Sequence, residues 1–385
     1  HHTPPQLRTT MRTCVFLTCA SCAAAFTITA SPSYSPSVAR SRAGYLELVA
    51  TPEKTSLIGG LGKKIRSLFG TPQGSKWSIP ALAWAPRSIN LPKETTGTSY
   101  LPADTLERCE AGTKFEKIKL SKDTTQIFTD MYDYAAKIRS GELNWEDVDD
   151  ADINTRLKWA GLLHRAKRNP GTFMMRLRVH NGIVTSEQMN FYADTVEPYG
   201  PDVGVIDITT RQNIQLRGVT LADGPGVIDG LHALNQTCIQ TGFDNIRNMV
   251  GNPLAGIDEH EMVDTRPFCN MLTDLVTLDT TTGERGNPEY CNLGRKFNIC
   301  VSGNRDDFAH THINDIGFVP AAHKETGEMG FNVVFGGYMS IKRVAASIPL
   351  DIWVPATLEA TRALCVATLR IFRDEGDRSD RQKAR

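Results

Sequence analysis

The stretch from Thr172 to Ile239 constrains the fold more than any other part of the chain. Hydrophobic alternation, a capping-box spacing at Thr185 and Gln188, and turn residues predict an ordered set of elements. They are a strand, a helix, two strands, a helix and a short apolar segment: 173–179, 185–199, 204–209, 214–219, 225–236 and 238–239. This order is that of a ferredoxin-like α+β unit, which is a platform and leaves function open.

The flanking segments predict a mixed α/β region after this unit and helices before it. Helical spacing is found over 127–138 with Gly141 as the cap, over 153–167, and over 266–279 with Asp264 or Thr265 as the cap. Strands are predicted at 316–321 and 331–335, and a last helix at 355–373. Gly, Pro, Lys and Thr alternate with short apolar patches over 46–120, so we expect irregular structure there.

The charge balance limits the classes of partner. The 385 residues include 43 Lys and Arg and 43 Asp and Glu, which gives a formal net charge of zero. Proteins that hold nucleic acid or a membrane surface nonspecifically rely on a strong cationic excess. We therefore expect no nucleic acid and no membrane among the partners. If the protein binds an anion, a local cluster of cationic side chains must bind it.

The cysteines indicate a reducing compartment. Six of the nine lie beyond the N-terminal segment, and they show no spacing typical of a zinc site or a disulfide framework: Cys109, Cys238, Cys269, Cys291, Cys300 and Cys365. His310 and His312 are two residues apart and could share a strand face, but a metal site needs three or four ligands. We expect no metal site built from this pair.

The first 45 residues have the composition of a targeting segment. Met11 is the expected start, an apolar stretch of small residues runs from Cys14 to Ala30, and a Ser/Arg-rich stretch without Asp or Glu continues to Ala43. This pattern resembles the bipartite plastid presequence of algae with secondary plastids. An ordinary secretory signal is the alternative.

Cations recur at structurally marked places. Arg176 lies in a predicted strand, Arg211 in a tight connection, Arg247 in an Asn-rich loop, and Arg295 and Lys296 precede the apolar run 299–301. In an extended chain Lys296 and Asn298 point to the same side. An inward-pointing cation is costly unless an anion meets it, so these residues favour a polyanionic ligand; structural salt bridges are the alternative for each.

A second set of cations lies on the predicted helix 153–167 and just after it. These residues are Arg156, Lys158, Arg165, Lys167 and Arg168. A solvated helix face is the usual explanation for such a set. A docking patch for an acidic partner is the alternative.

Nine motifs together resemble the N-terminal half of ferredoxin-dependent nitrite reductase, within the nitrite and sulfite reductase family that uses sirohaem. The resemblance runs from about Leu120 to the last residue. The motifs are Phe-Met-Met-Arg (173–176), Thr-Thr-Arg-Gln-Asn (209–213), Asp-Asn-Ile-Arg-Asn (244–248), Gly-Asn-Pro-Leu-Ala-Gly-Ile (251–257), Asp-Thr-Arg-Pro (264–267), Arg-Lys-Phe-Asn (295–298), His-Ile-Asn-Asp (312–315), Gly-Phe-Asn (330–332) and Asp-Arg-Gln-Lys (380–383).

The resemblance implies an oxidoreductase that reduces nitrite to ammonium with electrons from reduced ferredoxin, using sirohaem and a 4Fe-4S cluster. It implies that Arg176, Arg247 and Lys296 face the substrate, with Lys296 as the expected proton donor. Sirohaem carries eight carboxylates, which suit the planar, permanently charged guanidinium. The residues expected to bind the cofactor are Arg211, Gln212, Asn213, Asn248 and Arg295.

Sulfite reductase is the alternative within the resemblance, and Asn298 distinguishes the two. In the sulfite reductase pattern a Lys stands at this place, whereas nitrite reductases carry Asn. An additional cation suits the dianion sulfite, and an amide suits the monoanion nitrite. We therefore expect Asn298 to act with Arg176, Arg247 and Lys296 at the substrate.

The resemblance also implies a division into domains and cluster-binding cysteines that this sequence does not contain. We expect a plastid presequence (1–45), an N-terminal wrapping segment with helices (46–165), a ferredoxin-like half-domain (166–240) and a sirohaem domain (241–385) that ends before its second repeat. The family binds its cluster through Cys-x5-Cys and Cys-x3-Cys, which this sequence lacks, so these ligands are expected beyond Arg385. A fragment without activity is the alternative; otherwise we expect a monomer in the chloroplast stroma.

Overall fold

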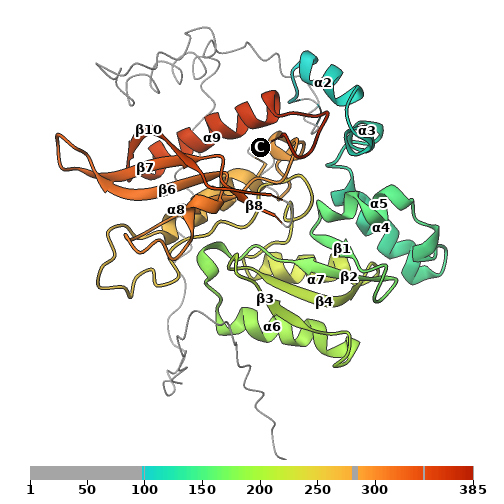
Figure 1. The fold of residues 1–385 in the computed structure, drawn as a ribbon. Helices are drawn as coiled ribbons and strands as arrows, with labels where there is room; N and C mark the ends of the chain where they lie inside the picture. Colours follow the sequence, from blue (N-terminus) through green and yellow to red (C-terminus); the bar gives the residue numbers. More distant parts are fainter. Residues whose placement is uncertain (1–97, 99, 280–284, 341–342, 385) are drawn as a thin grey trace, which may run out of the picture. The chain divides into compact units, whose positions relative to one another are not determined.

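The computed structural model describes Thr98 and residues 100–279, 285–340 and 343–384 (Figure 1). The predicted presequence, residues 1–45, and the segment 46–97 lie outside the described residues. Within the described ranges, no helix is both long enough and apolar enough to cross a bilayer. All described residues belong to one unit of the chain.

The described part begins with helices, so the prediction of irregular structure is wrong for residues 103–121. Helices α2 (Ala103–Glu110) and α3 (Lys114–Ser121) precede α4 (Ile127–Ser140). Gly141 ends α4 in the left-handed conformation with φ 79°, as its position predicted. Buried Glu116 and Lys119 of α3 form an ion pair at 2.7 Å, which the polar appearance of this stretch concealed.

The predicted helix over 153–167 is wrong. The chain instead forms α5 (Asp150–Asn154), a 3₁₀ turn η3 (Arg156–Lys158) and strand β1 (Leu162–His164), with a further 3₁₀ turn η2 (Trp145–Asp147) before them. Gly161 has φ 83°, and a Cβ there would lie 2.4 Å from the carbonyl oxygen of Cys238. Helix α5 has already ended at Asn154, and the close approach of the two backbones excludes a helix through Gly161. Arg156 is buried and pairs with Asp152 at 2.6 Å, so the five cations do not share a helix face.

The ferredoxin-like unit forms as predicted, with one exchange of strands. It comprises β2 (Thr172–Arg176), α6 (Ser186–Val196), β3 (Ile206–Ile208), β4 (Ile214–Thr220) and α7 (Gly224–Ala233), with 3₁₀ turns η4 (His180–Gly182) and η5 (Glu197–Tyr199). Thr185 and Gln188 form the predicted capping box. The antiparallel sheet has the order β1-β2-β4-β3. Strand β1 thus takes the edge beside β2, whereas residues 238–239 form no strand and Thr237 makes an isolated bridge with Arg178.

Cross-strand pairing divides the two faces of this sheet. Met175 pairs with Leu216, and both are buried in the core against α6 and α7. Arg176 pairs with Gln215 on the other face, where both side chains are partly exposed. Because successive residues alternate between faces, the sheet carries its polar groups on the side away from the helices.

The second sheet has the order β10-β7-β6-β5, in which only β5 and β6 are parallel. Helices α8 and α9 contact each other and share a buried core with this sheet. Thr265 is the N-cap of α8, and Pro267 lies in its first turn, as predicted. The prediction missed β10, which uses Pro355, so the last helix begins only at Leu358. The elements are α8 (Arg266–Thr277), η6 (Pro288–Tyr290), β5 (Ile299–Val301), η7 (Thr311–Ile313), β6 (Ile316–Ala322), β7 (Met329–Phe335), β8 (Tyr338–Met339), β9 (Val344–Ala345), β10 (Ile348–Pro355) and α9 (Leu358–Glu375).

Candidate cofactor and anion site

Three arginines from different segments come close enough to perturb one another. Arg176 lies at the end of β2, Arg211 in the β3–β4 connection and Arg247 in the loop after α7. Burial, followed by the charge of Arg211, lowers the pKa of Arg176. Burial, followed by Arg176, also lowers the pKa of Arg247 well below its usual value, with further lowering by Arg211 and Arg178 and opposition from Asp244. The fold therefore concentrates positive charge in a place with little water.

Arg247 is held by its own loop. Its guanidinium donates one hydrogen bond to the carbonyl of Thr241 and another, at 2.8 Å, to that of Phe243. Its backbone N–H donates to the carbonyl of Phe297 at 2.8 Å. Carbonyl oxygens accept from the guanidinium but carry no net charge, so they orient Arg247 without supplying a counter-ion.

The run 295–298 lies beside this loop. Ile246 and Phe297 form a parallel bridge, and both are buried in the core of the second sheet. Alternation along extended chains therefore directs Arg247, Lys296 and Asn298 to the opposite side. Asn298 is 5% exposed, and its backbone N–H donates to Asp315 at 2.8 Å.

The β3–β4 connection is fixed by side chains that bind backbone. Gln212 has φ 54°, and its amide exchanges two hydrogen bonds with the backbone of Gly251, at 2.9 and 3.0 Å. Asn213 is buried and accepts a hydrogen bond from Thr209 at 2.5 Å. Arg211 donates to the Asn314 side chain at 3.0 Å. The structure thus places Gln212 and Asn213 in scaffold contacts, and it turns Arg211 toward the His-Ile-Asn-Asp motif.

Asn248 joins three segments through one buried amide. Its oxygen accepts from the N–H of Val179, and its nitrogen donates to the carbonyl oxygens of Val179, Arg211 and Gln212 at 2.7, 3.0 and 3.1 Å. Removing these bonds would leave several buried backbone groups without partners. Asn248 therefore holds the Asn-rich loop against the ferredoxin-like unit.

The segments that carry the nine predicted site residues contact one another, although they are far apart in the sequence. The β3–β4 connection contacts the 245–252 loop, that loop contacts the 295–298 run, and Thr241 donates to the carbonyl of Arg176 at 2.9 Å. Their roles toward a ligand stay predictions. Among the described residues, no group of three or more His, Cys, Asp or Glu side chains is placed to hold a metal ion. The six cysteines of the described part are buried and free.

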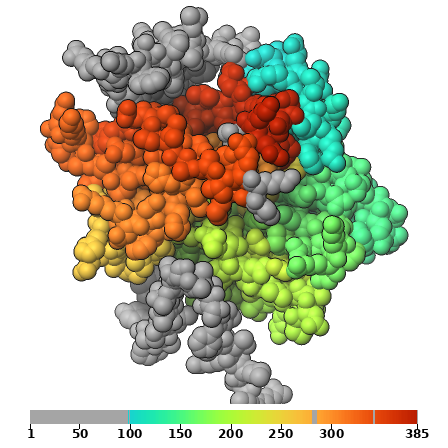
Figure 2. All heavy atoms as spheres, viewed as in Figure 1, coloured from blue at the N-terminus to red at the C-terminus, as the bar shows by residue number. Residues whose placement is uncertain are grey.

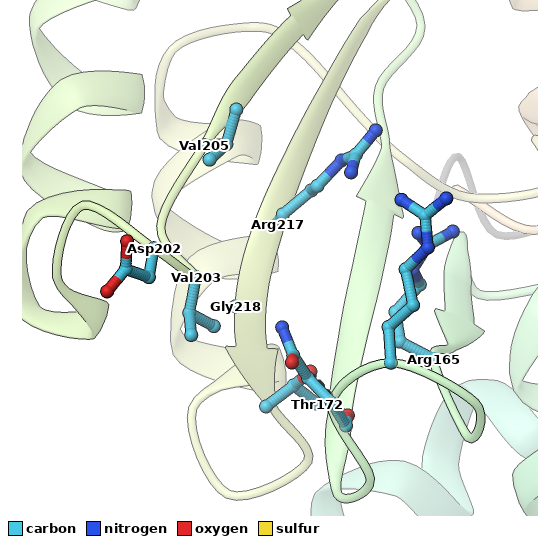
Figure 3. A pocket seen from close by; sticks show the side chains of 9 residues that line it. Arg165, Thr172, Asp202, Val203, Val205, Arg217 and Gly218 are labelled. Carbon is cyan, nitrogen blue, oxygen red and sulfur yellow. Dashed lines mark hydrogen bonds between the residues drawn. The ribbon is translucent and has the colours of Figure 1, made fainter.

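A separate basic pocket of about 190 Å³ lies on the ferredoxin-like unit (Figure 3). It is lined by the β1–β2 connection, by strands β2 and β4 and by the segment before β3. Its lining includes Arg165, Arg168 and Arg217, with Asp202 on the far side. The side chains of Arg165 and Arg217 extend toward the same side of the pocket. Burial, then Arg217 and Arg168, lower the pKa of Arg165. The predicted docking cations Arg165 and Arg168 therefore share a pocket, although not on a helix.

Comparisons with known proteins identify the family of the chain. The model of the nitrite/sulfite reductase ferredoxin-like half domain matches residues 165–234, and that of the nitrite and sulphite reductase 4Fe-4S domain matches residues 242–385. The chain belongs to the nitrite and sulfite reductase family.

Individual relatives narrow the relationship within this family. The chain is 46% identical over 272 residues to the chloroplastic ferredoxin–nitrite reductase of Zea mays, across 70% of this chain and 46% of the relative. It is 48% identical over 275 residues to that of Spinacia oleracea, across 70% and 44%. The solved NirA protein of Mycobacterium tuberculosis matches 71% of this chain and 49% of its own, with a TM-score of 0.60 and 24% identity, and shows the same fold. The chain spans about half the length of these relatives.

The side chains at the site suit the polycarboxylate cofactor of this family. Arg176 donates no side-chain hydrogen bond to another described residue, and its pKa is lowered by burial and by a second cation. A partly buried guanidinium in such surroundings is stabilised by a carboxylate that approaches it. The three arginines therefore suit the carboxylates of a sirohaem. Among the described residues, no group of three or more His, Cys, Asp or Glu side chains is placed to bind the 4Fe-4S cluster.

Two buried structural features escaped the sequence analysis. Arg178 is 1% exposed, and its guanidinium donates to four carbonyl oxygens, of Ile239, Gln240, Ile246 and Arg247. A charged cluster joins α3, residue 244 and the C-terminal segment through Glu116, Lys119, Asp244, Arg378 and Arg381. The only signal was a charge flanked by apolar residues, as in Leu177-Arg178-Val179, and surface strands share that pattern.

Arg178 is expected to support the site through stability. Arg178→Met should lower the free energy of unfolding by about 3 kcal/mol or more, because four buried carbonyl groups lose their donor. Arg217→Met is the matched control, since its ion pair with Asp207 is about a third exposed and should cost less than about 1 kcal/mol. Urea unfolding followed by tryptophan fluorescence measures both; equal losses would contradict the role of Arg178.

Proposed function

We propose that this chain supplies half of the cofactor and substrate pocket of an assimilatory, ferredoxin-dependent nitrite reductase. The observation that carries the proposal is the convergence of Arg176, Arg211 and Arg247 beside the edge formed by Lys296 and Asn298. The likeness to chloroplastic ferredoxin–nitrite reductases supports nitrite as substrate and a plastid location. Cell fractionation tests the location.

Each predicted residue has a role that its position supports. Arg211 holds carboxylates of sirohaem, and Arg295 and the scaffold residues Gln212, Asn213 and Asn248 complete that wall. Arg176 and Arg247 bind the nitrite anion, because fixed cationic donors in a water-poor site stabilise bound negative charge. Lys296 donates protons, since an ammonium gives up a proton more readily than a guanidinium. When bound, sirohaem and its 4Fe-4S cluster would relay electrons from reduced ferredoxin to the substrate.

The purified chain tests the proposal directly. Visible absorption bands of sirohaem, together with ammonium production from nitrite driven by a reduced dye, are the expected result for a reductase that contains this sequence. The same two measurements on the 385-residue chain alone decide between a functional half and a fragment without activity. A reductase with this sequence that carries no sirohaem would overturn the proposal.

Asn298 sets the preference for nitrite over sulfite in this proposal. Asn298→Lys should lower nitrite turnover relative to sulfite turnover by about tenfold, because an added cation at this edge favours the dianion. Asn190→Lys adds the same charge to the exposed surface of α6 and should leave the ratio unchanged. An unchanged ratio in Asn298→Lys would favour the alternative, in which this position does not separate nitrite from sulfite reductases.

We propose that the basic pocket receives an acidic side chain of reduced ferredoxin. Arg165 and Arg168 line the pocket, and Lys167 is exposed beside them. Burial and the neighbouring charges of Arg217 and Arg168 lower the pKa of Arg165, and an approaching carboxylate would stabilise these cations, so charge complementarity favours this partner.

Charge reversal tests the docking proposal. Arg168→Glu should lower ferredoxin-driven turnover several-fold at low salt, because steering depends on charge, and should leave dye-driven turnover unchanged. Lys324→Glu makes the same charge change at an exposed turn between β6 and β7 and serves as the control. Equal ferredoxin-driven rates in the two variants would remove this surface as the docking site.

A further inference from the structure

Arg381 lies where the C-terminal segment 376–384 meets helix α3 and the loop that carries Arg247. Figure 2 shows this segment (dark red) against the region of α2 and α3 (cyan), and Thr113 of that region donates its N–H to the carbonyl of Arg378 at 3.3 Å. The Arg381 guanidinium binds both carboxylate oxygens of Asp244, each at 2.5 Å. It therefore ties the C-terminal segment to residue 244 by a bidentate ion pair.

The same guanidinium stacks against two aromatic rings. Its central carbon lies 4.8 Å from the ring centroid of Phe115 and 4.8 Å from that of Phe243. The two rings also contact each other edge to face at 5.2 Å, and Trp159 contacts Phe243 at 4.8 Å. Planar Arg suits such a position because it pairs with a carboxylate and stacks on a ring at once.

Phe243 connects this stack to the candidate site. It has φ 54°, a left-handed conformation that is unfavourable for a bulky side chain and that must be held by its surroundings. This conformation directs the Phe243 carbonyl, which accepts the hydrogen bond from the Arg247 guanidinium at 2.8 Å. A change at the Phe243 ring is therefore transmitted to Arg247 through the backbone of Phe243 and one hydrogen bond.

We propose that Arg381 is a positioning residue for the anion-binding Arg247. By holding the Phe243 ring and the Asp244 carboxylate, Arg381 keeps the Phe243 carbonyl aimed at the Arg247 guanidinium and so sets where that guanidinium meets an anion. The inference rests on the proposed function, in which Arg247 binds nitrite. It assigns a purpose to a residue 134 positions away in the sequence, within the Asp-Arg-Gln-Lys motif.

The surroundings of Arg381 allow it to be changed without leaving a buried charge alone. Lys119 lies 3.0 Å from the same Asp244 carboxylate and is fully buried. Burial alone would raise the pKa of Asp244, but Lys119 and Arg381 outweigh it and lower that pKa. The Arg381 side chain is 17% exposed, whereas that of Arg378 is fully buried and binds Glu116. Arg381 is thus the member of the charged cluster best suited to substitution.

A double-mutant cycle tests whether Arg381 acts through Arg247. The dissociation constant of nitrite is measured from the visible spectrum of a reductase containing this sequence, as wild type, Arg381→Met, Arg247→Lys and the double variant. Arg381→Met should raise the constant at least fivefold when Arg247 is present, and less than twofold in the Arg247→Lys background. Arg381→Lys, which keeps the charge but not the planar stack, should fall between wild type and Arg381→Met.

A matched control separates positioning from general weakening of the C-terminal region. Arg370→Met removes the ion pair, at 2.6 Å, between Arg370 of α9 and Glu289. In the described structure these two residues form no hydrogen bond or ion pair with residues 241–247. Arg370→Met should leave the nitrite dissociation constant unchanged. Equal effects of Arg381→Met in both Arg247 backgrounds, or an equal effect of Arg370→Met, would overturn the proposal.

A crystal structure of the Arg381→Met chain distinguishes failure of this inference from failure of the proposed function. If the wild type binds no nitrite, the proposed function fails, and the spectroscopic cycle has no signal to compare. The inference is then tested by the crystal structure of the Arg381→Met chain. In that structure the Phe243 carbonyl should turn away from Arg247, and the hydrogen bond between them should be lost. An unmoved Phe243 with that hydrogen bond intact would overturn the inference even if the wild type reduces nitrite.

Discussion

Repulsion between neighbouring guanidinium groups is the constraint on which the described structure depends. Burial, followed by the charge of Arg211, lowers the pKa of Arg176, and burial, followed by Arg176 and then Arg211, lowers the pKa of Arg247. Such a cluster is stable only where rigid neutral groups hold it and where an anionic ligand can offset the desolvation and repulsion of the guanidinium groups. The carbonyls around Arg247 and the amide of Asn248 are those neutral groups, and the family's polycarboxylate cofactor is a ligand of the required charge.

Buried ion pairs outside the site hold the surrounding segments together. Lys119 and Asp244 are both fully buried at a separation of 3.0 Å, and Glu116 and Arg378 extend the pairing to the C-terminal segment. Buried ion pairs of this kind add little net stability but strongly disfavour alternative arrangements, since each unpaired charge would be costly. They therefore fix the positions of α3, the 241–248 loop and residues 376–384 relative to one another. The position of Arg247 in that loop depends on this arrangement.

Local chemistry made several elements predictable. The capping box at Thr185, the left-handed cap at Gly141 and the first-turn Pro267 act within a few residues, so each predicted its helix boundary. The helix predicted over 153–167 failed because Gly161 must approach the Cys238 backbone, a contact between residues 77 positions apart. The sequence did not predict strand β10 because a proline such as Pro355 is typical of a helix start. In the structure Pro355 is the last residue of β10, which pairs with β7.

The sequence by itself determined the ferredoxin-like order of elements, the family and the motif residues, because strand alternation, caps and motifs are local patterns. Only the tertiary structure decided what those residues contact. It showed Gln212, Asn213 and Asn248 bonded to the scaffold, Arg178 bonded to four carbonyls, and Arg381 stacked on Phe243. The physical reason is that the direction of a polar side chain follows from partners brought together by folding, which no spacing along one chain records.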